Sequence, residues 1–396
     1  MSLGIYISVP FCRTKCSYCN FASDVFSRAA FDRYVDRVCA DTASARRVAT
    51  EMAGQISRDV DSIYAGGGTP TVLDPAQLQR VFDAVRSQFS VRPDAEITVE
   101  CAPGTLVPSV LDALLRCGVN RVSLGVQSFV DGEAAAVGRL HKRATVLDDV
   151  ARLRAAGITN INVDLIAGLP HQTSESWQAS LAETVATSVP HVSVYMLEVD
   201  EDSRLGRELI AGGTRYHAHF VPDDEATADF YLAACETLDS AGVMQYEISN
   251  FARAGFESRH NLKYWTRQPY LGFGVDAHSM LISAVTEAEA VRFASADSLE
   301  KYVAGSALQK TVVSPAAALE ESFFLGLRLN RGVDLRKIAA DFGPDALANA
   351  RPVIAELSTA GLLQEDGDFI RLTARGRLLS NEVFQRFLAP AGASKA

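Results

Sequence analysis

The chain has 396 residues, of which 48% are hydrophobic, and a formal net charge of −10. This length is enough for a large core divided among two or three modules. Negative charge without a Lys/Arg-rich stripe argues against nucleic acid as a partner. No stretch reaches the roughly eighteen uninterrupted apolar residues of a membrane span, so we expect no integral membrane segment and a cytoplasmic location.

Through the first two hundred residues, short β-branched runs alternate with amphipathic stretches. Nearly continuous apolar character in these runs predicts a parallel sheet buried on both faces, which right-handed crossovers would curl. We therefore predict an α/β fold with a partial (β/α)6 barrel over residues 1–210. The predicted strands are GIYISV, DSIYAGGG, DAEITVEC, RVSLGVQS, NINVDLIAG and HVSVYMLEV, and the predicted helices include PAQLQRVFDAVRSQF, SVLDALLRCG and SWQASLAETVAT.

Polar residues come at or just after the C-terminal ends of several predicted strands. They are the run from Gly66 to Thr69, then Glu100, Gln127 and Asp164, while the first strand leads directly to Cys12. In a β/α barrel this end of the strands carries the chemistry. We expect these side chains to share one site.

After about residue 210 the β/α rhythm stops. Residues 215–242 predict a long helix and residues 247–280 a loop-rich segment, so that 211–313 form an extension packed on the barrel. Residues 314–396 predict helices at 316–328, 334–341 and 344–360, followed by two strands and a final helix, the outline of a winged helix. This module has as many acidic as basic side chains. DNA phosphates would attract it weakly, and we interpret it as a lid or protein-docking domain.

Three of the seven cysteines, Cys12, Cys16 and Cys19, form a C-x3-C-x2-C cluster after the first strand. An odd number in this arrangement is no secreted disulfide framework. Soft thiolates suit iron–sulfur clusters, zinc or copper(I). A structural zinc ion needs a fourth ligand, which only a remote histidine could supply here. A four-iron cluster on three thiolates would leave one iron open for another ligand.

At this point the sequence resembles the radical S-adenosylmethionine (radical SAM) enzymes, whose cysteine loop follows the first barrel strand. The resemblance implies a [4Fe–4S] cluster on the three cysteines and S-adenosylmethionine bound to its open iron. Reductive cleavage would then release a 5′-deoxyadenosyl radical, with the protein binding and orienting the cofactors. Positions that match the family's cofactor contacts are Tyr6, Tyr18, Gly67, Gly68, Thr69, Glu100, Gln127, Arg139 and Asp164.

Nearly the whole chain resembles one group of this family, which contains oxygen-independent coproporphyrinogen III dehydrogenases and heme chaperones. Shared segments include YISVPFC, YAGGGTPT, SLGVQSF and YLGFGVDAHS. Phe21 stands where the dehydrogenases have a further cysteine, and the barrel begins at residue 3 without their N-terminal extension. HNLKYW at 260–265 matches the H-N-x-x-Y-W motif that is linked to heme in the chaperones. One departure is Ser8, where the group commonly has histidine, which could alter the cluster's surroundings.

The resemblance thus implies a heme chaperone that passes heme to an unidentified heme-accepting protein and takes electrons from an unidentified donor. In the motif, His260 could ligate iron, Tyr264 could supply an oxygen ligand and Trp265 could stack on the porphyrin. The alternative is a coproporphyrinogen III dehydrogenase, which oxidatively decarboxylates two propionates to vinyl groups.

Overall fold

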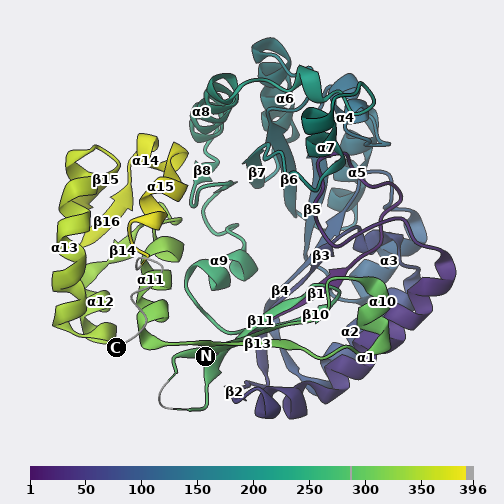
Figure 1. Ribbon diagram of the computed structural model, residues 1–396. Helices are drawn as coiled ribbons and strands as arrows, with labels where there is room; N and C mark the ends of the chain where they lie inside the picture. The colour runs from purple at the N-terminus through teal and green to yellow at the C-terminus, as the bar shows by residue number, and fades with distance from the viewer. Residues whose placement is uncertain (286–287, 389–396) are drawn as a thin grey trace.

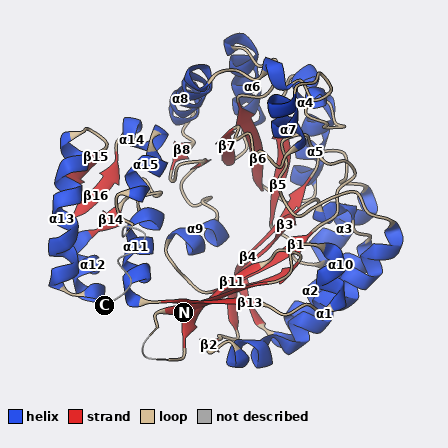
Figure 2. Ribbon diagram, viewed as in Figure 1, coloured by secondary structure: helices blue, strands red, loops and turns tan. Residues whose placement is uncertain are grey.

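The computed structural model describes residues 1–285 and 288–388, so the end of the predicted third module, 389–396, lies outside the described residues. Figures 1 and 2 show a curved sheet with helices on its outer side and a smaller module beside the open edge. In the described ranges, no helix combines the length and apolar character needed to cross a bilayer.

The six predicted barrel strands are confirmed, and they lie in chain order with parallel pairing throughout. Among the described strands the sheet does not close on itself, which makes the barrel partial. The strands are β1 Leu3–Val9, β3 Asp59–Gly67, β4 Ser90–Cys101, β5 Arg121–Gln127, β6 Asn160–Ala167 and β7 His191–Met196. The helices between them are α1 Arg28–Glu51, α2 Pro75–Gln88, α3 Pro108–Arg116, α4 Asp131–Ala136, α5 Arg143–Ala155 and α6 Ser174–Thr187, with the short 3-10 turn η1 Pro70–Val72.

Local sequence explains where these helices begin. Asp74 accepts hydrogen bonds from the backbone amides of Ala76 and Gln77, and the Gln77 side chain bonds back to the Asp74 amide. Pro75 occupies the first helical position, where its missing N–H costs nothing. This capping box fixes the start of α2 just after the strand-end loop of β3.

The two faces of the barrel strands differ in chemistry, which corrects the prediction of nearly continuous apolar strands. In β5, Val122, Leu124 and Val126 are fully buried in the main core, whereas Arg121 and Ser123 line a cavity on the concave side. The central region of a β/α barrel is normally filled by branched apolar side chains. A polar concave face indicates space for a ligand instead.

The segment after the barrel continues the same sheet at both edges. On one edge β9 Asn250–Ala252 runs antiparallel to β7 and pairs with β8 Met244–Gln245. On the other, β10 Tyr270–Gly274 runs parallel to β1 and is followed by β11 His278–Ser283, β12 Ala290–Ala294 and β13 Gln309–Val313, with β2 Gly54–Gln55 paired to β11. Helix α10 Leu299–Ala304 lies between β12 and β13 in the chain.

Two predictions for this segment were wrong in detail. The long helix expected over 215–242 begins only at Asp224, because Asp223 caps α8 Asp224–Ser240 by accepting from the Ala226 amide. Before it come α7 Arg204–Ala211 and the 3-10 turn η2 Ala218–Phe220. The stretch expected to be loop-rich also contains β9, α9 Arg259–Trp265, β10 and the start of β11.

The C-terminal module has a core of its own. It contains α11 Pro315–Gly326, α12 Leu335–Phe342 and α13 Pro344–Thr359, which match the predicted helices within two residues. A three-stranded sheet in the order β14 Val333–Asp334, β16 Phe369–Leu372 and β15 Leu363–Asp366 belongs to the same module. Strand β14 lies between α11 and α12, whereas β15 and β16 follow α13, and α14 Ala374–Leu378 and α15 Ser380–Gln385 come last. Ile354 and Ile370 are fully buried at its centre.

Candidate functional site

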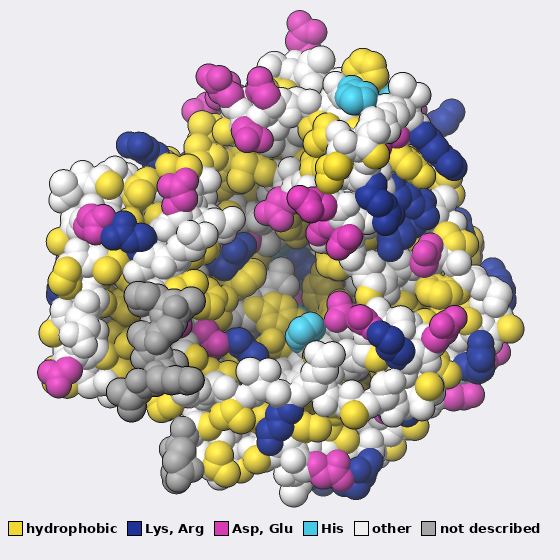
Figure 3. All heavy atoms as spheres, in the orientation of Figure 1, with side chains coloured by type: hydrophobic (Ala, Val, Ile, Leu, Met, Phe, Trp, Pro, Cys, Tyr) yellow, Lys and Arg dark blue, Asp and Glu magenta, His cyan; other side chains and the backbone are white. Residues whose placement is uncertain are grey.

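A cavity of about 630 Å³ lies on the concave side of the sheet. Figure 3 shows the molecule hollowed between the barrel and the C-terminal module. The cavity wall combines the cysteine loop, the strand ends, Asn261 of α9, and Leu378 and Ser380 of the C-terminal module. Parts of the chain that are far apart in sequence therefore enclose one space.

The three cysteines of the loop all line this cavity. The backbone amide of Cys12 donates to the Asp24 carbonyl, and the amide of Ser17 donates to Val137, which fixes the loop at both ends. Burial raises the pKa of the Cys12 and Cys19 thiols. Binding a metal centre would therefore release protons from them.

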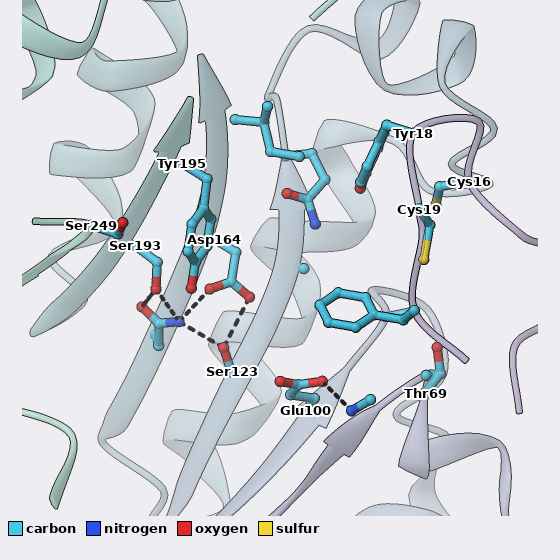
Figure 4. Close-up of a pocket in the computed structure, with 18 of the residues that line it drawn as sticks. Cys16, Tyr18, Cys19, Thr69, Glu100, Ser123, Asp164, Ser193, Tyr195 and Ser249 are labelled. Carbon is cyan, nitrogen blue, oxygen red and sulfur yellow. Dashed lines mark hydrogen bonds between the residues drawn. The ribbon is translucent and has the colours of Figure 1, made fainter. Parts of the chain in front are cut away.

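Within residues 1–285 and 288–388, no three His, Cys, Asp or Glu side chains converge on a single ion. The three thiolates of a four-iron cluster each bind a different iron, so they need not meet at one point. Figure 4 shows Cys16, Tyr18 and Cys19 on the loop opposite Glu100 and Asp164, with the Cys19 sulfur directed toward the cavity.

The glycines at the end of β3 let the cysteine loop and Glu100 approach the backbone closely. The amide of Gly68 donates to the Val9 carbonyl at 2.8 Å. A Cβ on Gly68 would lie 2.7 Å from that oxygen and 3.1 Å from the Cys12 sulfur. A Cβ on Gly66 would lie 2.7 Å from the Glu100 carboxyl carbon. No residue with a side chain fits either position without displacing its neighbours.

Gly68→Ala should therefore prevent most of the cluster assembly, because the added methyl pushes the β1 backbone and the Cys12 sulfur out of place. Iron and acid-labile sulfide per chain after anaerobic reconstitution measure this. Gly132→Ala on α4 is the matched control, since nothing lies within 4 Å of its added Cβ. Normal iron content in Gly68→Ala would show that the loop tolerates the displacement.

Glu100 is held at the centre of the cavity. Its carboxylate accepts hydrogen bonds from Tyr64 Oη at 2.9 Å and from the Gly67 amide at 3.1 Å. Burial, with a smaller contribution from Asp164, raises its pKa to about 7. It therefore offers a carboxylate oxygen to hydroxyl donors from a site where its charge is poorly solvated.

Asp164 belongs to a buried polar network on the neighbouring strands. It accepts from Ser123 Oγ at 2.9 Å and from Asn162 Nδ2 at 2.7 Å, and Asn162 also donates to Ser193 (Figure 4). Burial raises the pKa of Asp164. The three successive strands β5, β6 and β7 thus hold this side of the cavity together.

Arg139 and Gln127 meet above Gly125. A Cβ on Gly125 would lie 2.7 Å from an Arg139 guanidinium nitrogen and 3.2 Å from the Gln127 amide nitrogen. Gln127 adopts a left-handed conformation with φ 68°, and the buried Nε of Arg139 has no hydrogen-bond partner among the described residues. A guanidinium at a cavity wall with a buried donor left over is suited to a carboxylate ligand.

The structure brings nearly all the predicted cofactor residues to this cavity. Tyr6 and His260 are the exceptions. Tyr6 lies in an adjacent pocket that shares Phe21, Gly67 and Gly68 with the main cavity, and His260 lines neither space. Sequence reasoning missed several other cavity residues, although polar side chains at every second position of the strands were a visible signal. They are Tyr64, Arg121, Ser123, Asn162, Ser193 and Tyr195.

Comparison with known proteins identifies the family. Residues 6–183 match the radical SAM superfamily, and residues 313–379 match the HemN C-terminal domain. "Heme chaperone HemW" of Lactococcus lactis is 33% identical over 97% of this chain and 96% of its own. The Bacillus subtilis protein of the same name is 34% identical over 97% of this chain and 98% of its own.

The chain belongs to the HemW family. Among solved structures, the Escherichia coli coproporphyrinogen III oxidase HemN, described as a radical SAM enzyme, aligns with a TM-score of 0.81 at 26% identity. The alignment covers 98% of this chain and 90% of HemN. The resemblance inferred from the motifs and the radical SAM fold are both confirmed.

Membership of the radical SAM superfamily implies a [4Fe–4S] cluster and S-adenosylmethionine, and the cavity has groups suited to both. Three thiols on one loop suit the iron. The Glu100 carboxylate suits the ribose hydroxyls of the ligand. Its amino-acid part suits the close backbone approach at Gly67 and Gly68 and the Arg139 guanidinium, whose Nε is unpaired among the described residues.

The HemW motif at 260–265 lies on the short helix α9 and not in a loop. His260 is 1% exposed, and its ring nitrogens lie 3.0 Å from Ser62 Oγ and 2.9 Å from Tyr264 Oη. Burial lowers its pKa to about 3, so the ring is neutral. Because both nitrogens are engaged, His260 has none free for iron in this conformation, contrary to the simplest interpretation of the motif.

The other motif residues point in different directions. Asn261 lines the main cavity, Tyr264 lines the adjacent pocket, and Trp265 packs under Arg328 at 4.3 Å from the guanidinium carbon to the ring centroid. One face of the indole is therefore covered by the side chain of Arg328, just after α11. Helix α9 forms a partition between the two cavities.

Proposed function

We propose that this protein is a heme chaperone that binds a [4Fe–4S] cluster and S-adenosylmethionine, holds heme beside them and transfers it to an acceptor protein in the cytoplasm. The observation that carries the proposal is the adjacent pocket. It has a volume of about 280 Å³ and is lined by Tyr6, Tyr264, Tyr270 and Phe21. Aromatic walls next to the cysteine loop suit a flat apolar ligand.

In this proposal Cys12, Cys16 and Cys19 hold the cluster, which supplies electrons and an open iron. Glu100 accepts hydrogen bonds from ribose hydroxyls, and Arg139 pairs with the carboxylate of S-adenosylmethionine. Gln127, Asp164, Thr69 and Tyr18 complete the wall of the site. Heme and its acceptor are the partners, and an electron donor supplies the cluster.

His260→Ala should weaken heme binding by about tenfold or more, or roughly 1.4 kcal/mol, because Tyr264 loses its buried hydrogen-bond partner and no longer holds the pocket wall in place. Heme titration followed at the Soret band measures this. Tyr264→Phe keeps the ring and removes only the hydroxyl, so its heme affinity should lie between those of His260→Ala and the parent. Unchanged heme affinity in a folded His260→Ala protein would show that His260 of the motif does not contribute to heme binding.

Transfer and catalysis can be separated in one anaerobic experiment. The reconstituted protein is incubated with coproporphyrinogen III, S-adenosylmethionine and a reductant, with E. coli HemN as the positive control, and in parallel with heme and an apo-hemoprotein. We expect no protoporphyrinogen and faster heme acquisition by the apo-protein than from free heme. Repeated turnover to protoporphyrinogen would overturn the proposal and make this protein a dehydrogenase.

A further inference from the structure

We propose that His278 is the axial ligand of the heme iron, on the inner face of β1, β10 and β11. This inference deepens the proposed heme-chaperone function and depends on it. It identifies a metal-binding atom that lies outside the H-N-x-x-Y-W motif. The porphyrin trough is the adjacent pocket lined by Tyr6, Phe21, Tyr264, Tyr270, Asp276 and His278.

Most histidines of the chain use their ring nitrogens in hydrogen bonds and have fewer left to bind iron. Of the seven histidines in the sequence, five use at least one ring nitrogen in a hydrogen bond within the described part of the chain, namely His141, His171, His191, His217 and His260. His219 is exposed on η2 and lines neither cavity. His278 has an exposed side chain and lines the trough. It is the histidine best placed to reach a ligand there.

The His278 ring lies beside a carboxylate. His278 Nε2 lies 3.7 Å from an Asp276 carboxylate oxygen, and its side chain is 67% exposed. Metal-binding histidines commonly direct their second ring nitrogen to a carboxylate, which orients the ring and increases its basicity. With Nε2 facing Asp276, Nδ1 remains for iron. Asp276 lies in the turn between β10 and β11, and its backbone has a left-handed conformation with φ 53°.

The backbone of His278 packs directly against β10. Gly272 pairs with Tyr6 across β1 and β10, and a Cβ on Gly272 would lie 2.3 Å from the His278 carbonyl oxygen. The absence of a side chain at Gly272 thus lets the start of β11 approach this strand closely and fixes the position of His278. Tyr6 and Tyr270 line the same trough, so a flat macrocycle there would have aromatic rings beside it and the imidazole within reach.

The porphyrin trough lies next to the cysteine loop. Phe21, Gly67 and Gly68 line both the main cavity and the porphyrin trough. A heme in the trough would thus share these residues with the cluster site. The trough is also smaller than the main cavity, and His278 lies at its exposed side, so part of the heme would stay accessible to an acceptor.

The test compares His278→Ala and His278→Asn with His219→Ala in the full-length, cluster-reconstituted protein. Iron-protoporphyrin IX is titrated anaerobically, and the difference spectrum and magnetic circular dichroism report the affinity and the axial ligands. In the His278 variants we expect loss of the histidine-ligand signature and Kd raised at least about tenfold. His219→Ala should match the parent. Because His278 is exposed, its substitution should leave iron content and thermal unfolding unchanged.

Metal-free protoporphyrin IX separates coordination from stacking. The parent and His278→Ala should bind it with equal affinity, since only the iron contacts the imidazole. If the parent binds heme and His278→Ala retains the same spectrum and Kd, the assignment of His278 is overturned and the chaperone proposal stands. If the parent itself shows no saturable heme binding, the chaperone proposal fails and the inference fails with it.

Discussion

Cys16→Ser should leave the reconstituted protein almost without iron and acid-labile sulfide and remove its broad visible absorption. Cys16 is 9% exposed and faces the cavity from the middle of the loop. A serine hydroxyl is a harder ligand than a thiolate and does not ionise at neutral pH, so iron would be held by two thiolates. Binding of S-adenosylmethionine through the open iron should be lost together with the cluster.

Cys39→Ser is the matched control for this experiment. Cys39 is half-buried on α1, and its sulfur contacts the Arg80 carbonyl at 3.7 Å, away from the cavity. The Cys39→Ser protein should bind as much iron as the parent. Iron and sulfide retained at parental levels in Cys16→Ser, with a normal spectrum, would mean that the three cysteines do not act as the cluster ligands.

Glu100→Gln should change the stability and the ligand affinity of the protein in opposite directions. The ordinary pKa of a glutamate is 4.5, and burial raises that of Glu100 to about 7. The folded state therefore binds a proton that the unfolded state releases between these values. Proton binding by Glu100 therefore stabilises the folded state. This contribution to stability is complete below pH 4.5 and is lost as pH rises through 7. Above pH 7 the buried charge destabilises the parent.

Glutamine is uncharged, so the apo variant at pH 8 should be more stable than the apo parent by about 1–3 kcal/mol. The difference should vanish near pH 4.5. Affinity for S-adenosylmethionine should nevertheless fall by about tenfold to a hundredfold, since hydrogen bonds to a charged acceptor are stronger. Urea unfolding at several pH values and calorimetric titration measure the two effects. A stability difference that stays constant with pH would contradict the assigned titration.

The barrel strands and the cofactor site could be predicted because their signals are local. Each of the six strands is a short β-branched run, and the cysteine spacing and the glycines lie next to strand ends. The opposed faces of the strands were also visible in runs such as IYIS, where Tyr6 and Ser8 alternate with isoleucines. They were missed because the apolar residues dominated the interpretation.

The arrangement around α9 could not be predicted in the same way. Strand β10 contains the sequence YLGFG and pairs with β1, more than two hundred residues earlier. Glycine-rich strands have weak local propensity, and long-range pairing leaves no periodic signal. The role of His260 and its neighbours in heme binding stays a prediction of the motif. The burial of His260 depends on Ser62 of β3 and on the packing of α9 against the barrel, which only the tertiary structure shows.

The central position of β1 has a consequence for the order in which the protein matures during synthesis. Its partner β3 follows within about sixty residues, but its other partner, β10, leaves the ribosome only after residue 274 has been made. Until then the strand that carries the cysteine loop has one open edge, and the nascent chain exposes reactive thiols. Iron is therefore best delivered after translation. The metal site near the N-terminus can thus be completed only after β10, in the C-terminal half of the chain, has been made and has paired with β1.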